Sequence, residues 1–385
     1  MKTVKAAVMV KPGQIELQEF PYPKNMKDGL IVKMELSGIC GSDKHTYLGQ
    51  SKQYAGTAAE TDTPFPIIPG HENVGVIEEI CSKDNPSKDF NGNELKVGDR
   101  ITMCPDVTCG ECWYCKNTFG FPWCDHNKAY GNAFSTSEFP SLFGGWAQYI
   151  YIKPETFIYK VPKSISPKVA VLSELFTVAI GIDAAKECYS LANTGFGAFP
   201  TVVIMGVGPL GLCSLIRTRM MGAGTIIVVD KSDYRLDAAK KFGADYAMNI
   251  KDICEKDRLD YVKSLTSGRG SDIVIGCAGD PKAFSEGLNM LRKAGTYIEL
   301  GNFIDTGTTE INVSRQICIK NARIIGIGNH PYTEYDNTLK IFEKYKDQFP
   351  FEELVSHCYP LEKAEEALLK SMDLDSLKVV ISPNL

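Results

Sequence analysis

The sequence has 385 residues and a mass of 42.4 kDa, enough for about two domains with large cores, so a small disulfide-stapled module is excluded. Its 42 basic and 47 acidic residues give a net charge of −5, without the basic surplus of a protein that binds nucleic acid or anionic membranes. No apolar run approaches the roughly 18 residues of a membrane span, and the N-terminal residues lack a secretory signal, so we expect a cytoplasmic protein that acts on small molecules.

Up to about residue 160 the sequence is typical of an all-β unit. Short alternating or β-branched runs are separated by Gly, Pro and Asp turns, as strands of such a unit would be. These runs are residues 5–10, 30–36, 73–80, 100–104 and 146–152.

From residue 166 the pattern changes to an alternation of apolar strands and amphipathic helices. The predicted strands are 201–205, 225–229, 271–276 and 296–300, and the predicted helices are 209–221, 235–243, 259–267 and 282–293. Such an alternation predicts an α/β domain with a doubly wound parallel sheet, which is a nucleotide-binding architecture. After residue 327 the chain returns to helices, and a last strand at 377–382 is expected to rejoin the first domain.

Candidate ligands of a metal ion lie early in the chain. Cys40 follows the strand predicted at 30–36, and His71 and Glu72 precede the strand predicted at 73–80. One thiolate, one imidazole and one or two carboxylates are the ligands of a catalytic zinc, which keeps an open position for water or substrate. Each residue alone is weak evidence, but next to a nucleotide-binding domain the set predicts a zinc-dependent enzyme.

Four further cysteines fall within one glycine-containing loop. They are Cys109, Cys112, Cys115 and Cys124. Four converging thiolates form a closed tetrahedral zinc site that organises a lobe without its own core and leaves no open position for chemistry. Disulfides are the alternative, and a reducing compartment disfavours them. We therefore predict a structural zinc site.

A glycine-rich turn joins the strand at 201–205 to the helix at 209–221. Its residues are Gly206, Val207, Gly208, Pro209, Leu210 and Gly211. The three glycines permit a tight turn, close approach of a pyrophosphate and close helix packing, and the helix N-terminus favours phosphate charge. Asp230 ends the next strand, where a carboxylate binds ribose hydroxyls of NAD and repels the 2′-phosphate of NADP. Arg235 is a further candidate contact, and it keeps NADP as an alternative to NAD.

Together these motifs resemble the zinc-dependent medium-chain alcohol dehydrogenase family over essentially the whole chain. The matching segments, besides the glycine turn and Asp230, are GICGSDKH, PGHENVGVI, VGDRI, CGECWYC with Cys124, and GGWAQY. The resemblance implies a GroES-like β-rich catalytic domain formed by residues 1–174 and 328–385, and a Rossmann domain at 175–327. It also implies a homodimer or homotetramer.

The same resemblance assigns roles to residues around the predicted zinc. Cys40 and His71 hold the metal, and Ser42 and His45 pass a proton from the substrate to solvent. Glu174 aligns with a position where ethanol-oxidising members carry cysteine. A glutamate there, with Glu72 after His71, is similar to the polyol, sugar and threonine dehydrogenase branches, and either carboxylate could be the third ligand.

The sequence thus predicts hydride transfer between a polyol or secondary alcohol and NAD+, giving a ketone or aldehyde. Oxidation of an amino alcohol such as L-threonine and reduction of an aldehyde or ketone with NAD(P)H are alternatives. A non-enzymatic redox-binding module would have lost Cys40, Ser42 or His71, and all three are present. Lys378 aligns with a basic residue near the cofactor phosphates in relatives, and a solvated lysine is its alternative interpretation.

Overall fold

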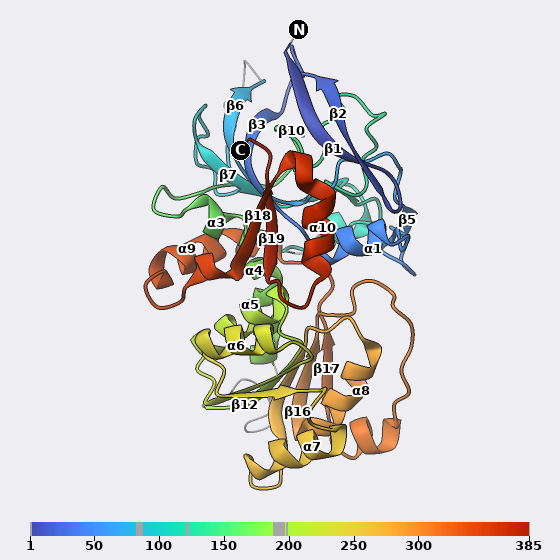
Figure 1. Ribbon diagram of the computed structural model, residues 1–385, viewed down its shortest axis with the longest axis vertical. Helices are drawn as coiled ribbons and strands as arrows, with labels where there is room; N and C mark the ends of the chain where they lie inside the picture. Colours follow the sequence, from blue (N-terminus) through green and yellow to red (C-terminus); the bar gives the residue numbers. More distant parts are fainter. Residues whose placement is uncertain (1, 82–87, 121–122, 188–196, 198, 385) are drawn as a thin grey trace. The chain divides into compact units, whose positions relative to one another are not determined.

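A computed structural model describes residues 2–81, 88–120, 123–187, 197 and 199–384, and the chain divides into two compact units (Figure 1). The first unit comprises Met1–Thr177 and Pro331–Leu385, and the second comprises Val178–His330. The sequence-based boundaries fall after residues 174 and 327. Within the described part of the chain, no helix has both the length and the apolar character needed to cross a membrane.

A mixed sheet forms the centre of the first unit. Its order is β11-β7-β6-β3-β19-β18, and β10 also pairs with β3. The strands are β3 (Leu30–Gly38), β6 (Glu72–Ile80), β7 (Arg100–Met103), β10 (Tyr149–Ile152), β11 (Ile158–Lys160), β18 (Val355–Pro360) and β19 (Lys378–Ser382). Because β19 pairs antiparallel with β3, the last strand of the chain lies in a sheet whose other central strands come from its first part.

A two-stranded ribbon and a helix cover part of this unit. The ribbon is β1 (Thr3–Lys11) with β2 (Gln14–Pro21), and the helix is α10 (Ala364–Met372). Ala364, Ala367 and Leu368 are buried at helical spacing and join a hydrophobic cluster with residues of β1 and Trp146. This cluster includes residues of β3, which ends just before Cys40, and of β19, which begins at Lys378.

Short elements complete the first unit. They are α1 (Gly41–Tyr47), β4 (Lys52–Gln53), β5 (Thr61–Asp62), β8 (Asp106–Val107), α2 (Trp113–Asn117), β9 (Lys128–Ala129), α3 (Pro167–Ala170), α4 (Ser173–Ile180) and α9 (Tyr335–Tyr345). α4 packs on α9 through the rings of Phe176 and Phe342, whose centroids are 5.1 Å apart, and through a 2.9 Å hydrogen bond between the hydroxyls of Thr177 and Thr338. This packing fixes the position of Glu174 near the start of α4.

A parallel sheet forms the second unit and confirms the predicted doubly wound architecture. Its order within the described residues is β14-β13-β12-β15-β16-β17, and every pairing is parallel. The strands are β12 (Thr201–Met205), β13 (Thr225–Asp230), β14 (Tyr246–Asn249), β15 (Ser271–Gly276), β16 (Leu291–Glu299) and β17 (Arg323–Gly326). The central strands are apolar runs buried along most of their length, as parallel strands covered on both faces should be.

Helices connect these strands in the predicted order. They are α5 (Pro209–Met220), α6 (Asp233–Lys241), α7 (Glu255–Ser264) and α8 (Pro281–Met290). The prediction of one helix through residue 293 was wrong at its end, because α8 stops at Met290 and Leu291 begins β16. Leu291 is buried in the hydrophobic cluster and pairs with Ser271, so burial in the sheet outweighs its helix propensity.

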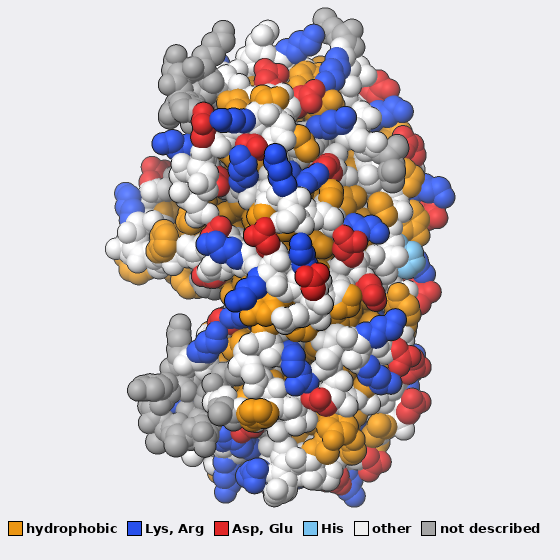
Figure 2. Space-filling model, turned by 90° about the vertical axis from the view of Figure 1, so that its left-hand side faces the viewer, with side chains coloured by type: hydrophobic (Ala, Val, Ile, Leu, Met, Phe, Trp, Pro, Cys, Tyr) orange, Lys and Arg blue, Asp and Glu red, His pale blue; other side chains and the backbone are white. Residues whose placement is uncertain are grey.

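Charges of both signs are interspersed over the face of the molecule in Figure 2. Together with the net charge of −5, this pattern lacks the basic surplus that nucleic-acid binding requires.

Candidate active site

Cys40 is held at the start of α1 by a local motif. Its backbone is extended, with φ −90° and ψ 167°, and its N–H donates a 2.8 Å hydrogen bond to Asp43 Oδ2. The Cys40 side chain in turn accepts from the backbone N–H of Asp43, which completes a capping box. The position of the Cys40 thiol is therefore set by hydrogen bonds within the GICGSD segment itself.

His71 brings its imidazole to this thiol from the start of the next long strand. The residue is buried, and its Nδ1 lies 3.8 Å from Asp43 Oδ1. This distance is longer than a hydrogen bond, and Nδ1 is buried without a hydrogen-bond partner among the described residues, so the carboxylate acts on the ring through its charge. Burial lowers the pKa of His71, but the charges of Cys40 and Asp43 outweigh it and raise the pKa well above its usual range. These anionic surroundings fit a bound cation.

Two glutamates complete the anionic set. Ligand atoms of Cys40, His71 and Glu72 all lie within 4.8 Å of one another. Glu174, on α4, is 7% exposed and acts electrostatically on both His71 and Glu72. The structure thus brings the ligand atoms of Cys40, His71 and Glu72 together, with the mixture of sulfur, nitrogen and oxygen donors that suits zinc, while Glu174 lies outside this group of ligand atoms.

Lys378 is buried, so the alternative interpretation of it as a solvated lysine is wrong. It is 2% exposed, and its Nζ donates to both oxygens of Glu72, at 2.6 and 2.7 Å, and to the Ile39 carbonyl at 3.0 Å. Burial lowers the pKa of Lys378, but the Glu72 charge raises it above its usual value. A lysine within the apolar run 377–382 is the sequence signal that could have indicated a buried partner.

Ser42 and His45 both lie on α1, beyond Cys40. Each is partly exposed, and His45 Nδ1 is 2.5 Å from Gln50 Oε1. A partly exposed imidazole can exchange protons with water near neutral pH, which the predicted relay requires.

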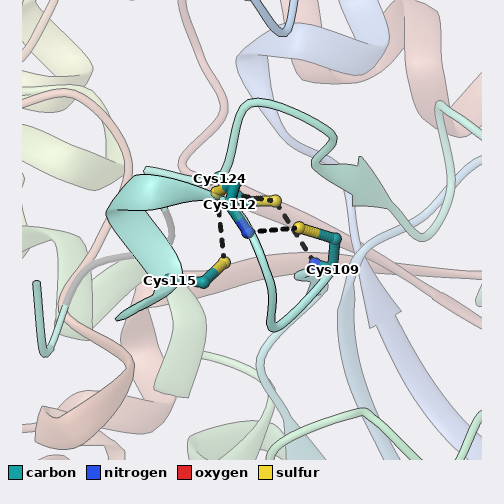
Figure 3. A group of neighbouring side chains, drawn as sticks. All are labelled: Cys109, Cys112, Cys115 and Cys124. Carbon is teal, nitrogen blue, oxygen red and sulfur yellow. Dashed lines mark hydrogen bonds between the residues drawn. The ribbon is translucent and has the colours of Figure 1, made fainter. Parts of the chain in front are cut away.

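The four lobe cysteines converge on one point (Figure 3). Cys112 Sγ is 3.5 Å from Cys115 Sγ and 4.0 Å from Cys124 Sγ. These distances are too long for disulfides and bracket the ~3.8 Å edge of a tetrahedron with Zn–S bonds of about 2.3 Å. Backbone hydrogen bonds from Cys115 and Asp125 lower the pKa of Cys112 to about 6, so its thiolate is favoured. The donor set fits the predicted structural zinc.

The aromatic side chains near these cysteines in the sequence are exposed rather than buried. Trp113 and Phe119 are 64% and 78% exposed, and Trp123 is also exposed. These side chains therefore form no buried core among the four cysteines, and we expect a bound metal to contribute to the stability of the lobe.

Replacing Cys112 with serine should therefore remove the lobe zinc. We expect the thermal unfolding midpoint to fall by about 10 °C or more, because metal binding in such a lobe is folding free energy. Calorimetry and zinc analysis measure both effects. The control is Cys318→Ser at an exposed cysteine of the second unit, which should change neither quantity. An unchanged zinc content in Cys112→Ser would contradict the assignment.

In the second unit, the glycine turn has the geometry that a dinucleotide requires. Gly206 has φ +89°, and a Cβ on Gly211 would lie 2.0 Å from the Gly206 carbonyl oxygen. A Cβ on Gly208 would meet only Arg235 Nη1, at 3.7 Å, so open space remains above this glycine at the N-terminus of α5. Pro209 and Leu210 begin that helix, and the turn therefore fits a pyrophosphate.

Asp230 lies at the carboxyl end of β13, next to the turn. Its Oδ2 accepts from Val207 N at 2.8 Å, and its Oδ1 accepts from Lys231 N at 2.7 Å and Ser232 N at 2.9 Å. The carboxylate is thus fixed by backbone donors at the edge where dinucleotides bind.

The chain is similar to known zinc-binding dehydrogenases. Residues 209–344 match the family described as zinc-binding dehydrogenase, and residues 26–163 match the alcohol dehydrogenase GroES-like domain, which confirms the GroES-like part of the fold prediction. A sorbitol dehydrogenase of Bacillus subtilis is 32% identical over 385 residues, covering 100% of this chain and 98% of the relative.

Solved structures show the same fold. An alcohol dehydrogenase from Thermotoga maritima superposes with a TM-score of 0.87 at 30% identity, with full coverage of both chains. A protein from Escherichia coli CFT073 in complex with NADH superposes with a TM-score of 0.78 at 24% identity, covering 99% of this chain and 100% of that one.

Proposed function

This chain belongs to the zinc-dependent medium-chain alcohol dehydrogenase family, and on that premise we propose that it oxidises a secondary hydroxyl of a polyol with NAD+. The first unit carries the substrate and the catalytic zinc, and the second carries the cofactor. The polyol substrate is supported by two buried carboxylates: Glu72, whose ligand atom lies within 4.8 Å of those of Cys40 and His71, and Glu174, whose charge acts on His71.

Each residue of the site has a separate task. Cys40, His71 and Glu174 would hold the zinc, while Lys378 donates a hydrogen bond to each carboxylate oxygen of Glu72. When bound, zinc supplies Lewis acidity that favours the alkoxide form of a substrate hydroxyl. Ser42 accepts the hydroxyl proton, and His45 exchanges it with water, since its imidazole is partly exposed.

A substrate panel tests the proposal. Zinc-loaded protein is incubated with NAD+ or NADP+ and with sorbitol, other polyols, L-threonine, or simple primary and secondary alcohols, and the appearance of NAD(P)H is followed by absorbance. We expect NAD+-dependent oxidation of a polyol that a chelator abolishes. Turnover with L-threonine alone, or only in the reductive direction with a carbonyl, would contradict the polyol assignment.

Cofactor choice gives a second test. Asp230→Ser should shift the kcat/KM ratio of NAD+ to NADP+ by about a hundredfold toward NADP+, because it removes ribose hydrogen bonds and the charge that repels a 2′-phosphate. Asp237→Ser on α6, the helix that follows Asp230, is the control, since Asp237 forms an exposed pair with Lys240 and its loss should leave the ratio unchanged. An unchanged ratio in Asp230→Ser would place the ribose contact elsewhere.

A further inference from the structure

His45 has a hydrogen-bonding partner in the residue that follows its helix and turn. The ring Nδ1 of His45 lies 2.5 Å from Oε1 of Gln50. The two residues also meet through the main chain, because the N–H of Gln50 donates a 2.8 Å hydrogen bond to the His45 carbonyl. Gln50 therefore contacts both the backbone and the ring of the residue that exchanges the proton with water.

The local sequence places Gln50 at this ring. α1 ends with Leu48 as its C-cap, and Gly49 follows with φ +90°. The Gly49 N–H donates to the Thr46 carbonyl at 3.1 Å, which together with the backbone bond from Gln50 to His45 forms a Schellman motif. In this motif the residue after the glycine contacts the residue three positions before the C-cap, usually through apolar side chains. Here the contact is a hydrogen bond between two polar side chains.

Contacts with α10 hold α1 in place. Lys44 Nζ donates to the Ser371 carbonyl at 2.7 Å, and Tyr47 Oη donates to Glu365 Oε1 at 2.7 Å. These contacts flank His45 in the sequence, so its backbone cannot shift without losing them. The remaining freedom of His45 is the rotation of its side chain.

The atom that faces the ring determines its tautomer. An amide oxygen has only lone pairs, so Nδ1 of His45 must carry a hydrogen and donate it to Gln50 Oε1. In a neutral imidazole the other nitrogen, Nε2, then has the lone pair. Nε2 therefore accepts the substrate proton, and the N–H bond formed there breaks when the proton passes to water. The bond from Nδ1 to Gln50 persists in both states, so the ring need not turn between them.

The partner of this imidazole is neutral. The ring of His45 forms no ion pair within the part of the chain that the structure describes. The charged side chains of α1, of the segment after it and of the α10 face that contacts it are engaged elsewhere; they are Asp43, Lys44, Lys52 and Glu365. A carboxylate next to an imidazole raises its pKa and keeps it charged at neutral pH. An amide orients the ring without adding a charge, which suits a group that must gain and lose a proton in each turnover.

We propose that Gln50 is a positioning residue that holds His45 as the Nδ1–H tautomer and so keeps Nε2 ready to take up the substrate proton, and this proposal rests on the proposed function. Gln50 acts through His45 and takes up no proton itself.

The first test measures the tautomer without turnover. Zinc-loaded protein with ¹⁵N-labelled histidine is studied by NMR at mildly alkaline pH, and the signals of His45 are assigned among the five histidines by their loss in His45→Asn. We expect a hydrogen on Nδ1 and none on Nε2 in wild type, and a mixture of tautomers in Gln50→Leu. A wild-type ring with its hydrogen on Nε2, or the same tautomer in Gln50→Leu, would overturn the proposal.

The second test is the pH dependence of kcat/KM with the alcohol that the substrate panel identifies. Gln50→Leu should lower kcat/KM about tenfold, a fraction of what a general base contributes. Gln50→Glu keeps an acceptor and adds a charge, so the acid limb of the profile should move up by about one pH unit. A merely structural role of Gln50 would change the rate without moving this limb.

Matched controls make the same changes at another glutamine. Gln348 is exposed and follows α9, and Gln348→Leu and Gln348→Glu should alter neither the tautomer of His45 nor the pH profile.

The outcomes separate the two proposals. If wild type oxidises an alcohol but the acid limb stays in place in Gln50→Glu, Gln50 does not position His45 for proton uptake, and the proposed function stands. If wild type oxidises no alcohol, the proposed function and the role in proton uptake both fail, while the NMR experiment still decides whether Gln50 sets the tautomer.

Discussion

Replacing Lys378 with methionine is expected to lower the free energy of unfolding of the first unit by about 3–5 kcal/mol. The reason is Glu72, which is 0% exposed and has both oxygens bound by Lys378 Nζ. Without that ammonium, the Glu72 carboxylate stays buried without its countercharge. The resulting destabilisation is larger than the net stabilisation that the intact ion pair provides. The effect is measured by urea unfolding of the zinc-loaded protein.

Tryptophan fluorescence reports selectively on the unit concerned. The chain has three tryptophans, Trp113, Trp123 and Trp146, and all belong to the first unit. Adding Glu72→Leu to Lys378→Met should restore most of the lost stability, because it removes the stranded charge. Lys340→Met is the control, since it breaks only an exposed pair with Asp336 and should cost less than about 1 kcal/mol. A loss below about 1 kcal/mol for Lys378→Met would show that Glu72 does not depend on this lysine.

Local patterns allowed much of the fold and the four-cysteine set to be predicted. The glycine turn, the cysteine spacing and the capping box at Cys40 are built by residues that are close in sequence, so their geometry follows from short segments. The parallel sheet followed from the alternation of apolar strands and amphipathic helices. In these cases a short stretch of sequence contains all the groups that must come together.

Pairings between distant residues could not be predicted in the same way. Lys378 and Glu72 are 306 positions apart and meet only because β19 pairs with β3. Tyr54 and Asp106, whose side chains form a 2.7 Å hydrogen bond, are likewise 52 positions apart. The exposure of Trp113 could not be predicted either. The position of an aromatic residue among metal ligands in the sequence does not indicate whether its side chain is buried.

The third zinc ligand is either Glu72 or Glu174, and the other contacts of each carboxylate favour one of the two. Glu72 lies within 4.8 Å of the Cys40 and His71 ligand atoms, but Lys378 donates to both of its oxygens, and an ammonium and a zinc ion compete for the same lone pairs. Glu174 approaches the same imidazole from α4, which is fixed by packing on α9. We therefore propose Glu174 as the third ligand.

Glu174→Gln should accordingly reduce the zinc content from about two ions to about one per chain and lower kcat/KM by about a thousandfold or more, since the catalytic ion loses an anionic ligand. Glu72→Gln, the matched variant, should keep both ions. Zinc analysis after dialysis measures this without reference to turnover, and the four-cysteine site serves as the internal standard. The reverse pattern, zinc lost from Glu72→Gln and kept by Glu174→Gln, would mean that zinc displaces Lys378 from Glu72 and that the buried pair is only the metal-free arrangement.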